Sequence, residues 1–120
     1  MKLKTGADIE EVERFGALLE KEHFCKRVYT EEERTHIADS GHPKETAAGI
    51  YCAKEAMAKA LGEGLFGLLP QELGVTWDDR GAPQPVLTGN AASRFGHLQM
   101  AISISHTKTI AFATCVILEE

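Results

Sequence analysis

Two charged side chains one helical turn apart lie in the segment Tyr51–Leu61, which reads Tyr-Cys-Ala-Lys-Glu-Ala-Met-Ala-Lys-Ala-Leu. In a helix, Glu55 and Lys59 share one face because they are four residues apart. The residues around them are almost all small or apolar, which indicates a largely buried helix. The pair is either an ordinary Glu–Lys pair that stabilises the helix by about 0.2–0.5 kcal/mol, or a carboxylate that holds Mg²⁺ beside an ammonium that binds a phosphate.

Asp8 is a second carboxylate in a position that favours cation binding. Residues 2–8 are predicted to form a short strand that ends at Asp8, in the segment Gly6-Ala7-Asp8-Ile9-Glu10. An Asp there either caps a helix that follows or holds a hard cation. Two carboxylates from separate elements, completed by water and phosphate oxygens, form an ordinary Mg²⁺ site. The sequence leaves open whether Asp8 and Glu55 meet.

His106 lies in a segment that is predicted to turn between two strands, Ile104-Ser105-His106-Thr107-Lys108. A histidine in a turn is often simply solvated. Four consecutive side chains here can donate hydrogen bonds or carry positive charge, which favours an anionic ligand.

The first half of the chain has the period of helices. Val12, Phe15 and Leu19 form one apolar helical face. Thr30 followed by three glutamates is a capping box that starts another helix. Gly62 is placed to end the helix that contains Glu55. The predicted helices span residues 10–21, 31–39 and 44–61.

The second half changes to the two-residue period of strands, as in Met100, Ile102 and Ile104. A strand, then helices, then a run of strands indicates an α+β fold with helices packed on a small antiparallel sheet. The length fits a single domain over residues 1–120. The predicted strands cover residues 73–77, 86–87, 100–104 and 110–118, with a short helix from residue 88 or 90 to residue 95.

Composition narrows the classes of protein. The net charge of −5 disfavours bulk nucleic-acid binding. The three cysteines are far apart and odd in number, which is typical of a reducing compartment. The apolar stretches are too short to cross a membrane, and no signal peptide is recognised. We therefore expect a soluble, cytoplasmic protein.

Four segments together resemble the holo-acyl-carrier-protein synthases, the short class of 4′-phosphopantetheinyl transferases. They are Gly6–Ile9, Ala53–Ala56 with Lys59-Ala60, Gly81–Pro83 and Ile102–Thr107. The resemblance implies Mg²⁺-dependent transfer of 4′-phosphopantetheine from coenzyme A to a serine of an apo acyl carrier protein, with release of 3′,5′-ADP, in fatty-acid biosynthesis. It also implies a homotrimer with an active site at each subunit interface.

The resemblance gives each matching residue a role. Asp8 and Glu55 match the two protein ligands of Mg²⁺. Lys59 matches the catalytic lysine near the pyrophosphate of coenzyme A. Either Glu55 or a metal-bound water is the implied base. The coenzyme A-binding segments contribute Lys59, Pro83, His106 and Thr107.

A basic and apolar stripe is predicted beside the buried face of the helix over residues 10–21. Such a stripe suits the acidic helix of a carrier protein. The alternative is a solvated charged face, because five glutamates lie close by in the sequence. The stripe consists of Arg14, Leu18, Lys21, Phe24 and Arg27.

Two positions depart from the family pattern. Ile50 stands where the family usually has an arginine, so one cation for the phosphates of coenzyme A is missing. Glu63 replaces a small polar residue near a phosphate-rich site. A non-catalytic module that binds coenzyme A or a carrier is therefore an alternative, as is a transferase dedicated to a secondary-metabolism carrier.

Overall fold

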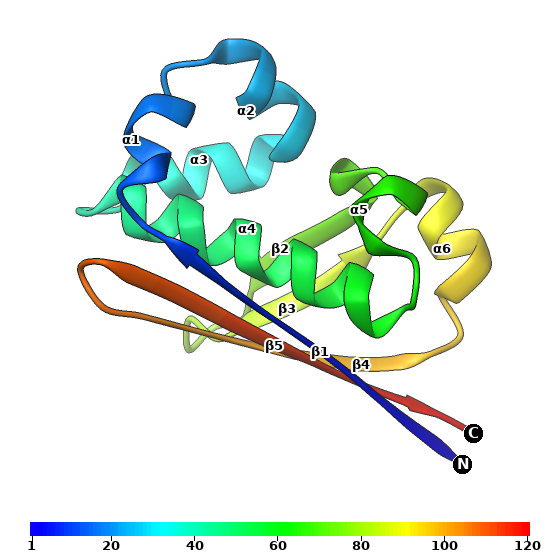
Figure 1. Cartoon of the computed structure of the whole chain (residues 1–120). Coiled ribbons are helices and arrows are strands. Elements are labelled where there is room, and N and C mark those ends of the chain that lie inside the picture. The colour runs from blue at the N-terminus through cyan, green and yellow to red at the C-terminus, as the bar shows by residue number, and fades with distance from the viewer.

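One long helix, α4 (Pro43–Ala60), lies at the centre of the computed structural model. The structure describes the backbone of residues 1–120 and every side chain except those of Leu65 and Phe66. A three-stranded sheet packs on one side of α4, and the short helices α1–α3 lie on the other (Figure 1). The hairpin formed by β2 and β3 completes the packing around this helix.

Local sequence accounts for both ends of α4. Pro43 occupies the first turn, where its missing N–H costs nothing. At the other end Gly62 has a φ of 80°, which favours glycine. Its N–H donates to the Lys59 carbonyl at 3.0 Å, and the Glu63 N–H donates to the Ala58 carbonyl at 3.1 Å. This is a Schellman motif, and the predicted end at Gly62 is confirmed.

The three-stranded sheet has the antiparallel order β1-β5-β4. Its inner face, towards α4, contains the fully buried Ala113, Cys115 and Ile117. Its outer face leaves Ile9 62%, Phe112 40% and Val116 45% exposed. The strands are β1 (Lys2–Glu11), β4 (Gln99–His106) and β5 (Ile110–Glu119).

A glycine allows β1 to approach α4 closely. A Cβ atom added at Gly6 would lie 2.1 Å from the Ala56 carbonyl oxygen and 2.7 Å from the Ala60 nitrogen. No side chain fits in that space. Residues of β1 that share the face of Gly6, namely Asp8 and Glu10, are consequently held against α4.

A fully buried ion pair ties α4 to the opposite layer. The Lys54 Nζ lies 2.8 Å from the Glu33 Oε1 and donates to the carbonyls of Pro70 and Leu73 at 2.9 and 3.1 Å. The Glu33 Oε2 also accepts the N–H of Val75 at 2.7 Å. Every proton of the ammonium therefore has a partner, as burial requires.

The fold class predicted from the sequence is confirmed, with two sheets in place of one. The second sheet pairs β2 with β3. The capping box is present, because the Thr30 Oγ1 accepts the Glu33 N–H at 3.1 Å and the Glu33 Oε1 accepts the Thr30 N–H at 2.9 Å. The remaining elements are α1 (Arg14–Leu18), α2 (Glu22–Val28), α3 (Glu31–Asp39), α5 (Gly64–Gly67), η1 (Pro70–Glu72), β2 (Leu73–Trp77), β3 (Pro83–Leu87) and α6 (Gly89–Phe95).

The helix predicted over residues 10–21 is wrong. Strand β1 continues to Glu11, since it pairs with β5 along its whole length. The helical part is only Arg14–Leu18, and Gly16 in its middle disfavours a longer helix. Asp8 accordingly lies inside a strand and caps no helix.

His106 is the last residue of β4 and pairs with Ala111, so its predicted place in the turn is also corrected. The turn is tighter than expected because the Thr107 N–H donates to the Ile110 carbonyl at 2.8 Å. Across the described chain, no helix combines the length and apolar character needed to span a membrane.

Candidate active site

The structure brings the predicted metal ligands to one place. Asp8 projects from β1 towards α4, where the Lys59 Nζ donates to its Oδ1 at 3.2 Å and to the Ala7 carbonyl at 2.9 Å. Glu55 lies one turn before Lys59 on α4 and interacts electrostatically with Asp8. Lys59 thus pairs with Asp8, and the ordinary Glu55–Lys59 pair is absent from the described ion pairs. We call Asp8, Glu10, Glu55 and Lys59 the carboxylate site.

One oxygen of this site has no partner. The Asp8 Oδ2 is buried and makes no hydrogen bond within the described chain. A buried carboxylate oxygen without a partner is rare and costly in a folded protein. The donor set, with oxygens from two elements, suits a hard cation. The residues therefore fit Mg²⁺.

Among the described side chains, no group of three or more His, Cys, Asp and Glu could hold a metal ion by itself. A cation at the carboxylate site would take its other ligands from water and from substrate oxygens, as Mg²⁺ commonly does.

Crowding raises the pKa of two of these carboxyls. Burial, and then the nearby negative carboxylate of Asp8, raise the pKa of Glu10 to about 7. Burial and the charge of Asp8 also raise the pKa of Glu55, while the nearby Tyr51 hydroxyl and the charge of Lys59 oppose this. Burial and the neighbouring carboxylates raise the pKa of Tyr51 to about 12. The site thus concentrates negative charge in partly desolvated surroundings.

Sequence analysis missed Glu10 because it ended the strand at Asp8. The alternation of Gly6, Asp8 and Glu10 on one face of a longer strand was the available signal. Arg14, predicted to meet a carrier, forms an ion pair with Glu10. Its guanidinium is therefore linked to the carboxylate site.

A second group of predicted residues surrounds a separate cavity of about 210 Å³. Pro83 and His106 line it together with Ile50. His36, His42 and Trp77 also line this cavity, which we call the imidazole cavity. Thr107 is not among its lining residues. The Thr107 Oγ1 accepts the N–H groups of Thr109 and Ile110 at 3.2 and 3.0 Å and so shapes the hairpin.

Strand β5 lies between β1, which contributes Asp8 and Glu10 to the carboxylate site, and β4, which contributes His106 to the imidazole cavity. Glu10 and His106 both pair with Ala111, so their Cα atoms lie two strand spacings apart, roughly 10 Å. Between them, the thiol of Cys52 on α4 donates to the Ala111 carbonyl at 3.5 Å. Packing of α4 on the sheet therefore divides the carboxylate site from the imidazole cavity within one copy of the chain.

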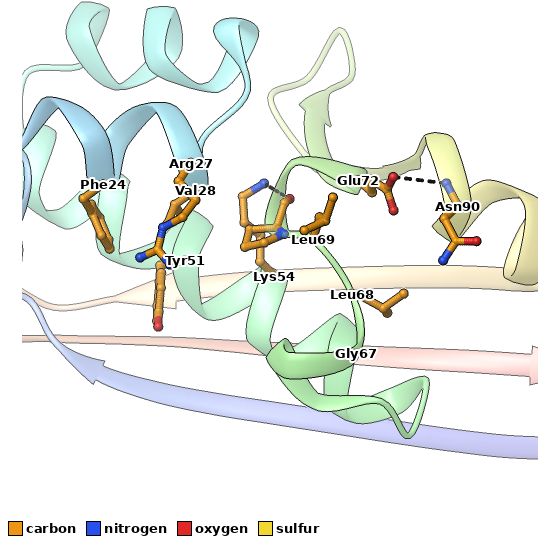
Figure 2. Close-up of a pocket in the computed structure, with 11 residues that line it drawn as sticks. Phe24, Arg27, Val28, Tyr51, Lys54, Gly67, Leu68, Leu69, Glu72 and Asn90 are labelled. Carbon is orange, nitrogen blue, oxygen red and sulfur yellow. Dashed lines mark hydrogen bonds between the residues drawn. The ribbon is translucent and has the colours of Figure 1, made fainter.

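A larger cavity of about 460 Å³ lies next to Tyr51 (Figure 2). Phe24, Arg27 and Tyr51 line one end of it, and Leu68 and Leu69 lie towards the other. Phe24 stacks on Tyr51, with 6.3 Å between the ring centroids. Tyr51 and Glu55 lie four residues apart on α4 and so share one face of the helix. This mostly apolar cavity therefore adjoins the carboxylate site.

The predicted carrier stripe is not one face of a helix. Arg14 and Leu18 belong to α1, whereas Lys21 lies after it and precedes α2. Leu18 is half-buried against the core, and Lys21 is exposed. Phe24 and Arg27 lie on α2 and line the larger cavity.

The unexpected Glu63 has a partner. The Arg94 Nη1 lies 2.8 Å from the Glu63 Oε1, so a cation from α6 offsets the added negative charge.

The fold packs a central helix against a three-stranded sheet, and the site combines Asp8 and Glu55 with Lys59. Both features are found in one known class of enzymes. The chain belongs to the 4′-phosphopantetheinyl transferase superfamily, whose family description matches residues 4–115. The family resemblance drawn from the sequence is thereby confirmed.

Individual relatives sharpen this assignment. The holo-[acyl-carrier-protein] synthase of Caldanaerobacter subterraneus is 37% identical over 120 residues, covering 97% of this chain and 94% of the relative. A Bacillus anthracis holo-(acyl-carrier-protein) synthase in complex with CoA (3′,5′-ADP) is 32% identical, with a TM-score of 0.80 and coverage of 95% and 94%. The ACPS–CoA complex of Chronobacterium ammoniagenes has a TM-score of 0.85, 25% identity and coverage of 100% and 99%.

Proposed function

We propose that this chain is a holo-acyl-carrier-protein synthase that transfers 4′-phosphopantetheine from coenzyme A to a serine of an apo acyl carrier protein. Full-length relatives with that name support the proposal. The observation that carries it is the buried, unpartnered Asp8 Oδ2 beside Glu55 and Lys59. This combination of carboxylates and an ammonium suits a phosphoryl-transfer site.

Asp8 and Glu55 are the residues that would hold Mg²⁺. When bound, the ion supplies positive charge to the pyrophosphate oxygens as their charge grows during transfer. Lys59, whose side chain is 51% exposed, can bind the same oxygens with its remaining proton while its bonds to Asp8 and the Ala7 carbonyl hold it in place.

The reaction forms one bond and breaks one. The serine Oγ of the carrier bonds to the β-phosphorus of coenzyme A, and the bond from that phosphorus to the bridging oxygen breaks. Adenosine 3′,5′-bisphosphate leaves with the bridging oxygen. Glu55 is placed to accept the serine proton, since its raised pKa makes it a stronger base than an ordinary carboxylate.

Binding of the donor requires residues from two copies of the chain. Pro83, His106 and Thr107 are the proposed nucleotide-binding residues, and α4 separates the imidazole cavity from the carboxylate site of the same copy. The exposed apolar face of the sheet, with Ile9, Phe112 and Val116, can bury area between copies. We propose a homotrimer with each site at a subunit interface.

The carrier is proposed to dock near the larger cavity. Arg27 and Phe24 line that cavity, Lys21 is exposed close to them in sequence, and Leu18 and Arg14 lie on the preceding helix. Cationic side chains around apolar anchors suit an acidic carrier helix. A fatty-acid carrier in the cytoplasm is the partner we propose.

Intact-mass measurement of an apo carrier tests the function. Incubation with the enzyme, coenzyme A and Mg²⁺ should add one phosphopantetheine group to the carrier. Glu55→Gln should lower the rate by at least ~10²-fold, because it weakens both cation binding and proton acceptance. The matched control Glu31→Gln, at an exposed position in α3, should act like the wild type. An unmodified carrier that nevertheless binds would show a binding module in place of an enzyme.

A further inference from the structure

The imidazole cavity has a charge composition that the proposed function does not explain. Ile50 lines it at the position where a cation for the donor phosphates was expected. No lysine or arginine lines this cavity among the described side chains. Its titratable lining groups are three histidines and one glutamate: His36 from α3, His42 before α4, Glu45 from α4 and His106 from β4.

Hydrogen bonds fix the orientation of the His42 ring. The Thr46 Oγ1 donates its own proton to the Ser40 Oγ at 2.9 Å. It can therefore only accept from His42, whose Nδ1 lies 3.3 Å away. The Nδ1 of His42 consequently carries a proton, and the Nε2 of the neutral ring is an acceptor.

The His106 ring is oriented in the same way. Its Nδ1 lies 3.2 Å from the Thr107 carbonyl oxygen, which can only accept. The Nδ1–H is again the donor, and the Nε2 becomes a donor only when the ring gains a second proton. The two rings lie close together, with 5.4 Å between their centroids at an angle of 61°.

Part of the lining of this cavity is aromatic. The Trp77 indole stacks on His36 with 3.6 Å between centroids and 9° between planes. Ile50 and Ile104 add apolar side chains to the lining, and aromatic and apolar surfaces of this kind suit a purine ring. A ligand with a purine and an attached phosphate suits a lining that combines these residues with histidines.

We propose that His42 and His106 bind the 3′-phosphate of the donor only as imidazolium ions, so that nucleotide binding takes up protons. This inference rests on the proposed function, since coenzyme A is the nucleotide that the chain would bind. Imidazoles change charge between about pH 5 and 8, whereas the arginine expected at position 50 keeps its charge throughout. This chain should thus bind its donor more tightly as the pH falls.

Calorimetry with adenosine 3′,5′-bisphosphate tests the proposal on the intact protein. Titrations at pH 7 in two buffers of different ionisation enthalpy give the number of protons bound with the ligand. The wild type should take up roughly one proton more than His42→Gln or His106→Gln. Each variant should bind about tenfold more weakly, since it loses a charge-assisted hydrogen bond. Both histidines are exposed, so the fold should survive, as circular dichroism can check.

Two controls complete the design. His97→Gln changes an exposed histidine outside the cavity and should retain the wild-type affinity and proton count. Quenching of Trp77, the single tryptophan, should accompany binding and place the ligand in this cavity.

A wild type that takes up no protons, or variants with its proton count and affinity, would overturn the proposal, as would absence of binding. Carrier modification measured on the same samples separates this outcome from the function. A carrier that still gains phosphopantetheine leaves the enzyme assignment intact. Proton-linked binding without modification would instead support the cavity and contradict the enzyme.

Discussion

Lys54 and Lys59 lie five residues apart on α4, and each contacts one carboxylate. Lys54 and Glu33 are buried almost completely, and every proton of the ammonium has a partner. Lys59 is half-exposed, and its partner Asp8 retains a buried oxygen with no hydrogen bond. The first pair is complete within the fold. The second leaves one carboxylate oxygen without a partner within the described chain, and we propose that a bound cation completes it.

Replacing each lysine by methionine should show the largest difference between the two ion pairs, in stability and in activity. Lys54→Met leaves Glu33 buried without its cation and should destabilise the protein by about 3–5 kcal/mol. Lys59→Met, the matched change on the same helix, should cost no more than about 1 kcal/mol in stability while abolishing most activity. Urea unfolding measures both values. Equal losses of stability would remove the distinction between the pairs.

Mixing two inactive variants tests whether the functional pair works across copies. Glu55→Gln damages the carboxylate site, and His106→Glu, at an exposed position that lines the imidazole cavity, should repel the donor from that cavity. Neither alone should modify the carrier efficiently. Subunits exchanged between them should regain activity, since some interfaces then combine two intact halves. Light scattering should report trimers. Active monomers, or mixtures that stay inactive after confirmed exchange, contradict an interface site.

Charge reversals near the larger cavity should separate carrier docking from the donor. Arg27→Glu and Lys21→Glu should raise the carrier KM roughly fivefold with little change in the KM for coenzyme A. Arg14→Glu should alter both constants, because Arg14 pairs with Glu10 in the carboxylate site. Lys2→Glu, at the far end of β1, serves as the control. Unchanged carrier constants for Lys21 and Arg27 would place docking elsewhere.

The smallest effect concerns the pH dependence of stability in chelator. The folded pKa of Glu10 is about 7, above the ordinary 4.5, so the folded state holds this proton more tightly than the unfolded state. Its stabilising contribution is complete below about pH 4.5 and is lost as the pH rises through 7. Glu10→Gln should therefore gain thermal stability relative to wild type between pH 5 and pH 8. Glu11→Gln, on the opposite face of β1, should not. A constant difference between Glu10→Gln and wild type contradicts the shift.

Strong local signals account for what the sequence predicted well. The capping box at Thr30 and the positive φ at Gly62 depend on neighbouring residues alone, so the ends of α3 and α4 were readable. The length of β1 could not be predicted from local sequence, because pairing with β5 extends the strand beyond Asp8. Local periodicity instead favoured a helix that Gly16 shortens.

The residues of the candidate site likewise fall into those that the sequence predicted and those that it did not. Asp8, Glu55 and Lys59 were identified by residue type and family resemblance, but their contacts arise from the close approach at Gly6. Glu10, His36 and Trp77 were missed, since they join their sites only through the packing of distant elements. The buried partner of Lys54 lies 21 residues away and carries no local signal.

The dependence of turnover on Mg²⁺ tests most directly whether the Lys59–Asp8 pair, unlike the Lys54–Glu33 pair, belongs to a metal-binding site. Carrier modification should stop in excess chelator and return when Mg²⁺ is restored, and Asp8→Asn should require far more Mg²⁺ than the wild type. Enzyme that keeps its full rate in chelator, or an Asp8→Asn variant with the wild-type Mg²⁺ requirement, would contradict the assignment of Asp8 and Glu55 as the metal-binding carboxylates.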